Sequence, residues 1–169
     1  MIRTLFVFLA LLLSCSLRAQ TDIDCTFKYR MPLETDIRIC SYEPISKQDL
    51  TFISNVISDI PESYYKYLST IAGRADLKKR SIERVDIALL SLEALNDGTL
   101  PSGFNRNNDV VGRYYPGERR VYVTLDSIKN TETVLVHEVV HLMNSDYNIS
   151  NRDIDENLAY AFEEFWINR

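Results

Sequence analysis

Apolar residues recur at helical spacing between residues 46 and 71. From Ser46, a candidate helix cap, they recur every three or four positions up to Ile60, and Pro61 is expected to end this helix or to open the next. A second helix is expected over residues 64 to 71. The pattern therefore predicts two helices that meet near the proline.

The middle of the chain favours strands and turns. Residues 82 to 92 carry both a helical and a strand pattern, and we favour a strand over residues 85 to 90. A loop rich in Asn, Gly and Pro follows over residues 96 to 109 and could border a cleft. Two β-rich runs within residues 110 to 124 then flank the turn signal at Pro116-Gly117, which predicts a β-hairpin. Its open edge could hold an extended peptide, or the hairpin could be only one wall of the core.

Two further helices are expected at the end of the chain. After a polar start at Thr131-Glu132-Thr133, the residues up to Met143 are apolar nearly all round, which predicts a buried helix. A last helix is expected from Asp153 to Trp166, with Glu156 in capping-box position and an apolar face towards the core. Strands followed by helices of this kind predict an α+β fold.

The first nineteen residues differ from the rest and have the pattern of a cleaved secretory signal peptide. Arg3 precedes an apolar run over residues 5 to 13, which is too short for a transmembrane helix of about 20 apolar residues. We therefore expect residues 20 to 169 to form a single domain that is secreted or periplasmic, without a transmembrane segment. The alternative is a lipoprotein in which a lipid on Cys15 tethers the domain to a membrane, although Leu13 fits such a cleavage site badly.

Removal of the signal peptide changes the cysteine count and the charge. Cys25 and Cys40 would remain as a pair, which predicts one disulfide bond in an exported protein. By the chain-entropy model, closing a loop of about 16 residues stabilises the fold by up to about 3 kcal/mol. The formal charge would fall from −5 to −7, since Arg3 and Arg18 are lost, which argues against a nucleic-acid partner.

The strongest chemical signal lies in the expected buried helix. His137-Glu138-Val139-Val140-His141 contains both histidines of the chain, and residues four apart share one helix face, so two imidazoles can converge on one metal ion. Glu138 lies beside that face, where a carboxylate can take a proton from a water molecule that zinc has acidified and pass it to a leaving amine. The competing interpretation is two core histidines bonded to backbone carbonyls, but a metal ion would satisfy all three buried polar side chains at once.

A hydrolytic zinc site commonly has three protein ligands, and no histidine is left for the third. The candidates lie on the last helix, where small residues would let another helix approach closely. We expect Glu156 to be the third ligand, with Glu163, near it in helical projection, as the lesser candidate. The alternative role for Glu156 is the capping box alone.

Together these residues resemble the HExxH zincin metallopeptidases with a glutamate third ligand, in particular the catalytic domains of the anthrax lethal factor type. Beyond the histidine motif, the resemblance includes Gly112-Arg113-Tyr114-Tyr115, Val121-Tyr122-Val123 and the helix with Glu156, within about the last sixty residues. It implies a zincin-like fold with a small N-terminal sheet over the cleft, the HExxH helix and a C-terminal ligand-bearing helix. It also implies a bound zinc ion and hydrolysis of a protein or peptide substrate. The residues that it assigns are the ligands His137, His141 and Glu156 and the general base Glu138.

Two points remain open at the level of the sequence. A tyrosine that would stabilise the oxyanion could be Tyr147 or Tyr160, and each also fits a packing role. The rival functions are a zinc-stabilised, non-catalytic binding module on the cell surface, and a metal-free secreted domain that associates through the hairpin edge. The presence of Glu138 argues against the binding module, because a structural zinc site needs no base.

Overall fold

A computed structural model of the chain describes residues 25–32, 35–73, 78–91, 111–124 and 132–169. The expected signal peptide, Cys15 and the loop over residues 96 to 109 lie outside these ranges. Within them the chain forms five strands and three helices, so the expected α+β class is confirmed. No helix in these ranges is long and apolar enough to cross a membrane.

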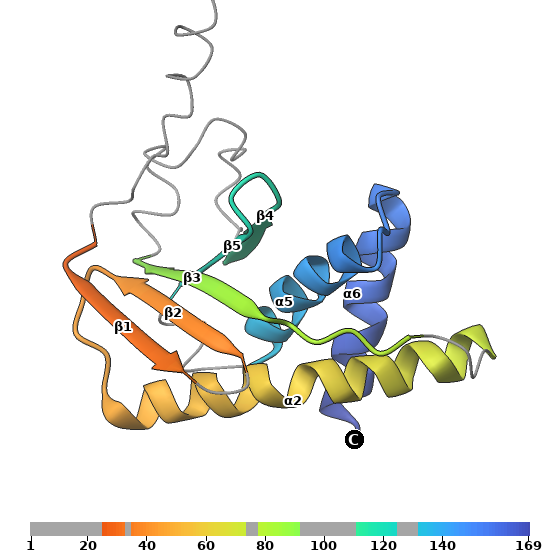
Figure 1. Cartoon of the computed structure of the whole chain (residues 1–169), viewed down its shortest axis with the longest axis horizontal. Helices are drawn as coiled ribbons and strands as arrows, with labels where there is room; N and C mark the ends of the chain where they lie inside the picture. The colour runs from red at the N-terminus through yellow and green to blue at the C-terminus, as the bar shows by residue number, and fades with distance from the viewer. Residues whose placement is uncertain (1–24, 33–34, 74–77, 92–110, 125–131) are drawn as a thin grey trace, which may run out of the picture.

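The strands form one mixed sheet (Figure 1). Its order is β1-β2-β3-β5-β4, in which β2, β3 and β5 run parallel and the outer strands β1 and β4 pair antiparallel with their neighbours. The bounds are Phe27–Pro32 for β1, Asp36–Ser41 for β2, Arg84–Leu90 for β3, Gly112–Tyr115 for β4 and Arg120–Thr124 for β5. The strand expected over residues 85 to 90 and the expected hairpin are both confirmed. The sheet draws strands from both halves of the chain and not from the N-terminal half alone.

The hairpin of β1 and β2 was not predicted from the sequence. In β2 the buried residues Ile37 and Ile39 alternate with the half-exposed Asp36 and Arg38, which is the period of a strand with one buried face. This alternation extends over only six residues, which is too short to distinguish a strand from other structures in the sequence alone. Register places Ile39 beside Ile87 of β3, on the face that joins the hydrophobic core.

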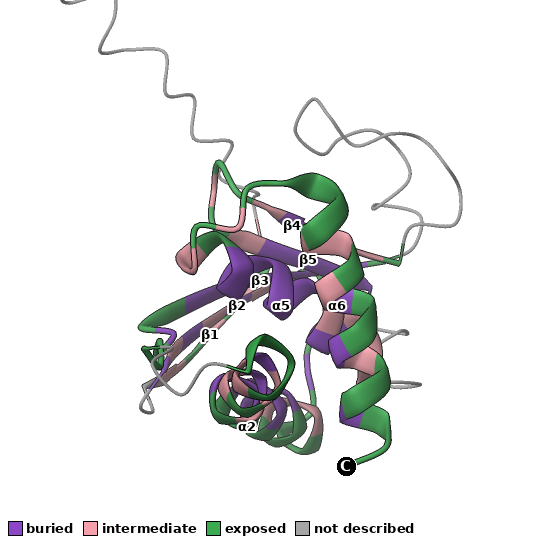
Figure 2. Cartoon of the chain, turned by 90° about the vertical axis from the view of Figure 1, so that its right-hand side faces the viewer, coloured by how far each residue is buried: buried purple, intermediate pink, exposed green. Residues whose placement is uncertain are grey.

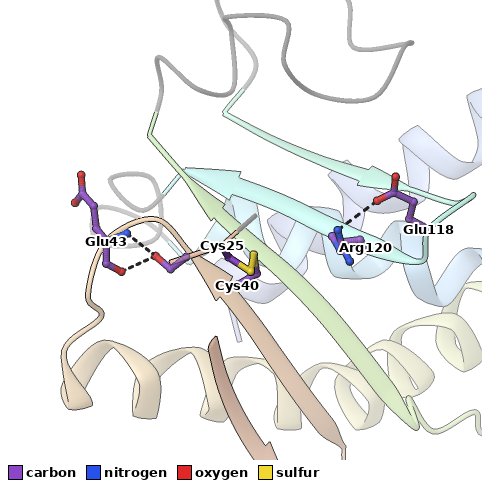
Figure 3. The surroundings of a disulfide bond; sticks show 6 residues. Cys25, Cys40, Glu43, Glu118 and Arg120 are labelled. Carbon is purple, nitrogen blue, oxygen red and sulfur yellow. Dashed lines mark hydrogen bonds and ion pairs between the residues drawn. A yellow bond between two sulfur atoms is a disulfide. The ribbon is translucent and has the colours of Figure 1, made fainter. Parts of the chain in front are cut away.

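The predicted disulfide bond between Cys25 and Cys40 is present, with the two Cα atoms 5.5 Å apart (Figure 3). Cys25 lies two positions before β1, and Cys40 is the penultimate residue of β2. The bond therefore covalently closes the N-terminal hairpin at the end opposite its turn.

Helix α2 is a single helix, Lys47–Ala72, so the expectation that Pro61 separates two helices was wrong. The expected cap is confirmed, because the Ser46 side chain accepts a hydrogen bond from a first-turn N–H. A proline in a helix interior costs about 3 kcal/mol. Ile57, Ile60 and Tyr64 are fully buried on both sides of Pro61, and each large apolar side chain contributes about 1.5–3 kcal/mol by burial. Continuous packing on one core thus offsets the lost hydrogen bond.

Helix α5, Thr133–Asp146, lies between the sheet and α6, Arg152–Ile167 (Figure 2). Most of α5 is buried, as its all-round apolar sequence predicted. The expected start of α6 at Asp153 was wrong. Asn151 is the N-cap, and its side chain accepts a hydrogen bond from Ile154 N–H (3.1 Å), since Asn caps a helix as well as Asp. Glu156 therefore lies outside the capping-box position, and its carboxylate has no capping role.

Candidate metal centre

Helices α5 and α6 bring together the three residues expected as metal ligands. The Nε2 atoms of His137 and His141 each lie 3.7 Å from Oε2 of Glu156, and one ligand atom from each residue lies within 4.8 Å of the others. Donor atoms around a tetrahedral zinc ion, each about 2.1 Å from it, lie about 3.4 Å apart. The group could therefore hold a metal ion if the two imidazole–carboxylate distances shortened by about 0.3 Å and the widest separation by up to about 1.4 Å.

Two further carboxylates, of Glu163 and Asp155, face the imidazole nitrogens that point away from Glu156. Glu163 Oε2 lies 3.2 Å from His137 Nδ1, in hydrogen-bonding geometry, and Asp155 Oδ1 lies 2.9 Å from His141 Nδ1, out of line for a hydrogen bond. Metal-binding histidines commonly present one nitrogen to the ion and the other to such a carboxylate. Glu163 thus holds a ring nitrogen that points away from Glu156. Asp155 was not predicted from the sequence.

The histidine side chains are buried enough for their protonation to matter. Desolvation lowers the pKa of His137, and the neighbouring His141 lowers it further, while Glu163 and Glu156 act in the opposite direction. A lowered pKa keeps the imidazole neutral at neutral pH, and a neutral imidazole is the form that binds a metal ion. The environment of His137 therefore fits metal ligation.

Glu138 points from the same helix towards β4. Its carboxylate accepts a hydrogen bond from the backbone N–H of Tyr114, and its burial raises its pKa to about 8 against the opposing effect of this bond. The contact depends on Gly112, because a Cβ atom there would lie 2.6 Å from Val134 Cγ1 and 3.0 Å from Glu138 Cγ. Sequence reasoning gave Gly112 no role of its own, although a glycine inside a β-rich run is a signal of close backbone approach.

A cleft of about 580 Å³ opens over these residues. The β4 side of the hairpin lines one wall, with Arg113 and Tyr115, and the start of α6 lines the other, with Arg152 and Tyr160. His137, His141 and Glu156 lie in its lining together with Glu138. A volume of this size is typical of ligand-binding pockets.

The two candidate tyrosines lie in different surroundings. Tyr160 lines the cleft, its ring centroid lies 4.6 Å from that of His137, and the residue is 63% exposed. Tyr147 is absent from the cleft lining. Its ring packs edge-on against Tyr64, and its hydroxyl accepts a hydrogen bond from Arg80 N–H (3.2 Å). A catalytic role for either stays a prediction, and only Tyr160 is placed where it could contact a substrate.

Neither protein-family models nor curated proteins give a match to this sequence. The functional assignment therefore rests on the geometry and chemistry of the site itself.

Proposed function

We propose that this protein is an exported, zinc-dependent endopeptidase of the zincin type. The observation that carries the proposal is the convergence of both imidazole Nε2 atoms on Glu156 Oε2, in a cleft that also holds Glu138. Two imidazoles and one carboxylate form the donor set of hydrolytic zinc sites, which leave a coordination position open. A zinc ion bound there would supply a Lewis acid that acidifies a water molecule and polarises a peptide carbonyl.

Glu138 is the proposed general base. It lies next to His137 in the sequence and in the same cleft, within reach of a water molecule held near the three ligands. Its carboxylate would take the proton of the attacking water and hand it to the leaving nitrogen. The Tyr114 N–H would hold the carboxylate in one orientation during this transfer.

The edge strand β4 supports a peptide as the substrate. Thr124 N–H donates to the Val111 carbonyl (3.0 Å), and the antiparallel ladder alternates, so the main-chain groups of Gly112 and Tyr114 face away from β5. The Tyr114 N–H is already donated to Glu138, so an extended peptide could pair as an added strand with the remaining outward-facing groups along the cleft wall.

Tyr160 is the proposed oxyanion donor. Its exposed ring stands beside His137 at the mouth of the cleft, so its hydroxyl could reach a carbonyl oxygen bound near the ligands. A hydrogen-bond donor aimed at developing negative charge stabilises the transition state.

A peptide library tests the proposal. The zinc-loaded protein, residues 20 to 169, should cleave peptides in it, and Glu138→Gln should reduce the rate by about 100-fold or more while its zinc affinity is retained. Full activity in Glu138→Gln would contradict the mechanism. A library left uncut by the zinc-loaded wild-type protein would instead favour the non-catalytic binding module.

Export is part of the proposal, and the disulfide bond between Cys25 and Cys40 is compatible with it, because such bonds persist outside the cytosol. The mass of the native protein distinguishes the two proposed forms. A free N-terminus near Gln20 indicates secretion or a periplasmic location, and a lipid-modified Cys15 indicates a membrane tether.

A further inference from the structure

A series of hydrogen-bonded polar side chains, buried at its α2 end, leads from α2 to the candidate metal centre. The Tyr64 hydroxyl donates a hydrogen bond to Asn144 Oδ1, and Asn144 Nδ2 donates to Asp155 Oδ1 (2.7 Å). The same oxygen of Asp155 lies 2.9 Å from His141 Nδ1. Tyr64 lies on α2, Asn144 on α5 and Asp155 on α6. The series ends at the proposed ligand His141.

The first two members lie where apolar side chains would be expected. Tyr64 and Asn144 are both fully buried, and the Tyr64 ring packs edge-on against Phe162 in the hydrophobic core. A buried amide destabilises a fold unless its hydrogen bonds are made, and here both ends of the Asn144 amide are used. The Asn144 amide nitrogen also lies 3.4 Å from the Asp155 carbonyl oxygen, so this side chain ties α5 to α6 as well as to α2 and fixes where Asp155 lies.

The chemistry of the groups sets the direction of the series. A carboxylate only accepts hydrogen bonds, so the amide nitrogen of Asn144 must face Asp155 and its carbonyl oxygen must face Tyr64. That oxygen requires a donor, and burial raises the pKa of Tyr64, which keeps the phenol protonated. Asp155 is thereby held with one oxygen towards His141 Nδ1. Although the contact is out of line for a hydrogen bond, the negative charge 2.9 Å away favours a proton on Nδ1 and leaves Nε2 to face Glu156.

We propose that Tyr64 and Asn144 are positioning residues for the ligand His141. They act through Asp155, whose charge they hold beside His141 Nδ1, and so they favour the tautomer that the metal ion needs. The inference rests on the proposed metal centre. His137 has a different Nδ1 partner, Glu163, and so provides an internal comparison.

The test uses Tyr64→Phe, which removes only a hydroxyl group, and Tyr67→Phe as the matched control. Tyr67 is a neighbour on α2 whose ring contacts both Tyr64 and Phe162. Its hydroxyl takes no part in the hydrogen bonds from Tyr64 to Asp155. Zinc affinity is measured on residues 20 to 169 by competition with a chromogenic chelator. We expect Tyr64→Phe to weaken zinc binding about tenfold and Tyr67→Phe to leave it within about twofold of wild type.

A second measurement separates positioning from general loss of packing. The chain has only two histidines, so ¹⁵N NMR of the metal-free protein can resolve the tautomer of each ring. Tyr64→Phe should shift His141 away from the Nδ1–H form and leave His137 unchanged. Asn144→Leu, of similar volume, should have the same effect; if it does not fold, Tyr64→Phe alone decides.

Three results would overturn the inference. Wild-type zinc affinity in Tyr64→Phe refutes the positioning role while leaving the metal centre intact. Equal weakening in Tyr64→Phe and Tyr67→Phe shows that packing, and not the hydrogen bond, is responsible. A wild-type protein that takes up no zinc refutes the proposed function itself, and with it this inference.

Discussion

Substitution of Gly112 by alanine tests the contact between β4 and the proposed base. The new Cβ would lie 2.6 Å from Val134 Cγ1, 3.0 Å from Glu138 Cγ and 3.2 Å from Glu138 Oε1. Carbon atoms in contact prefer about 3.5–4.0 Å, so strand and helix must separate by about 1 Å. Overpacking of this kind costs about 1–3 kcal/mol. For a domain of this size, 2 kcal/mol lowers the melting temperature by about 4–8 °C.

The same displacement should act on hydrolysis more than on metal binding. A shift of about 1 Å in a catalytic group can reduce a rate by about 100-fold, whereas the three atoms nearest to the new methyl group belong to Val134 and Glu138 and not to a proposed ligand. Peptide cleavage, chelator competition and thermal unfolding measure the three effects on one sample.

Gly117→Ala is the matched control. It introduces the same methyl group into the same hairpin, where the nearest atom would be Tyr115 Cε1 at an ordinary 3.4 Å. Both substitutions restrict the unfolded chain to a similar extent, so that contribution cancels in the comparison. If Gly112→Ala melts and cleaves peptides like Gly117→Ala, the close approach of β4 to Glu138 has no energetic or catalytic consequence and the reasoning fails.

Three further results are expected. Replacing Cys25 and Cys40 by serine should lower the free energy of unfolding by about 3 kcal/mol in denaturant titration, since the bond spans 15 positions, and an unchanged midpoint would contradict this. Glu156→Ala should weaken zinc binding more than Glu163→Ala, which removes only a partner of a ligand and should cost about tenfold; the reverse order would mean that the ligand is Glu163. Metal analysis of untagged residues 20 to 169 should give about one zinc per chain, and removing it with a chelator should lower the melting temperature. Protein that neither contains zinc nor takes it up would refute the metal centre.

The helices and strands that the sequence predicted are those with a local signal. The buried helix with the histidines has a continuous apolar run after a polar start, and the hairpin around Pro116-Gly117 has turn chemistry between two β-rich runs. Pro61 misled the prediction because its cost is local, whereas the compensating burial of α2 comes from residues distant in sequence. The cap of α6 was misplaced because Asn151 and Asp153 are equally good caps, and sequence alone does not choose between them.

In the candidate site too, the residues with a local sequence signal were predicted and those joined by long-range contacts were not. The spacing of His137 and His141 is a property of one helix, so it was visible in the sequence, and Glu156 was found by asking which acid a neighbouring helix could supply. The contacts of Gly112 with α5 and of Tyr64 with Asn144 join distant parts of the chain. No spacing rule reaches across such separations, so these contacts required the structure.

The metal ligands and the proposed substrate wall belong to different parts of the chain. All three proposed ligands lie on α5 and α6, between His137 and Glu156, whereas β4 precedes these helices and approaches α5 closely at Val134 and Glu138. Contacts between segments close in sequence form quickly during folding, because little chain entropy is lost in bringing them together. The three proposed ligands can thus come together early, before α2 adds Tyr64, and we expect substitutions that reshape β4 to change peptide cleavage more than zinc binding.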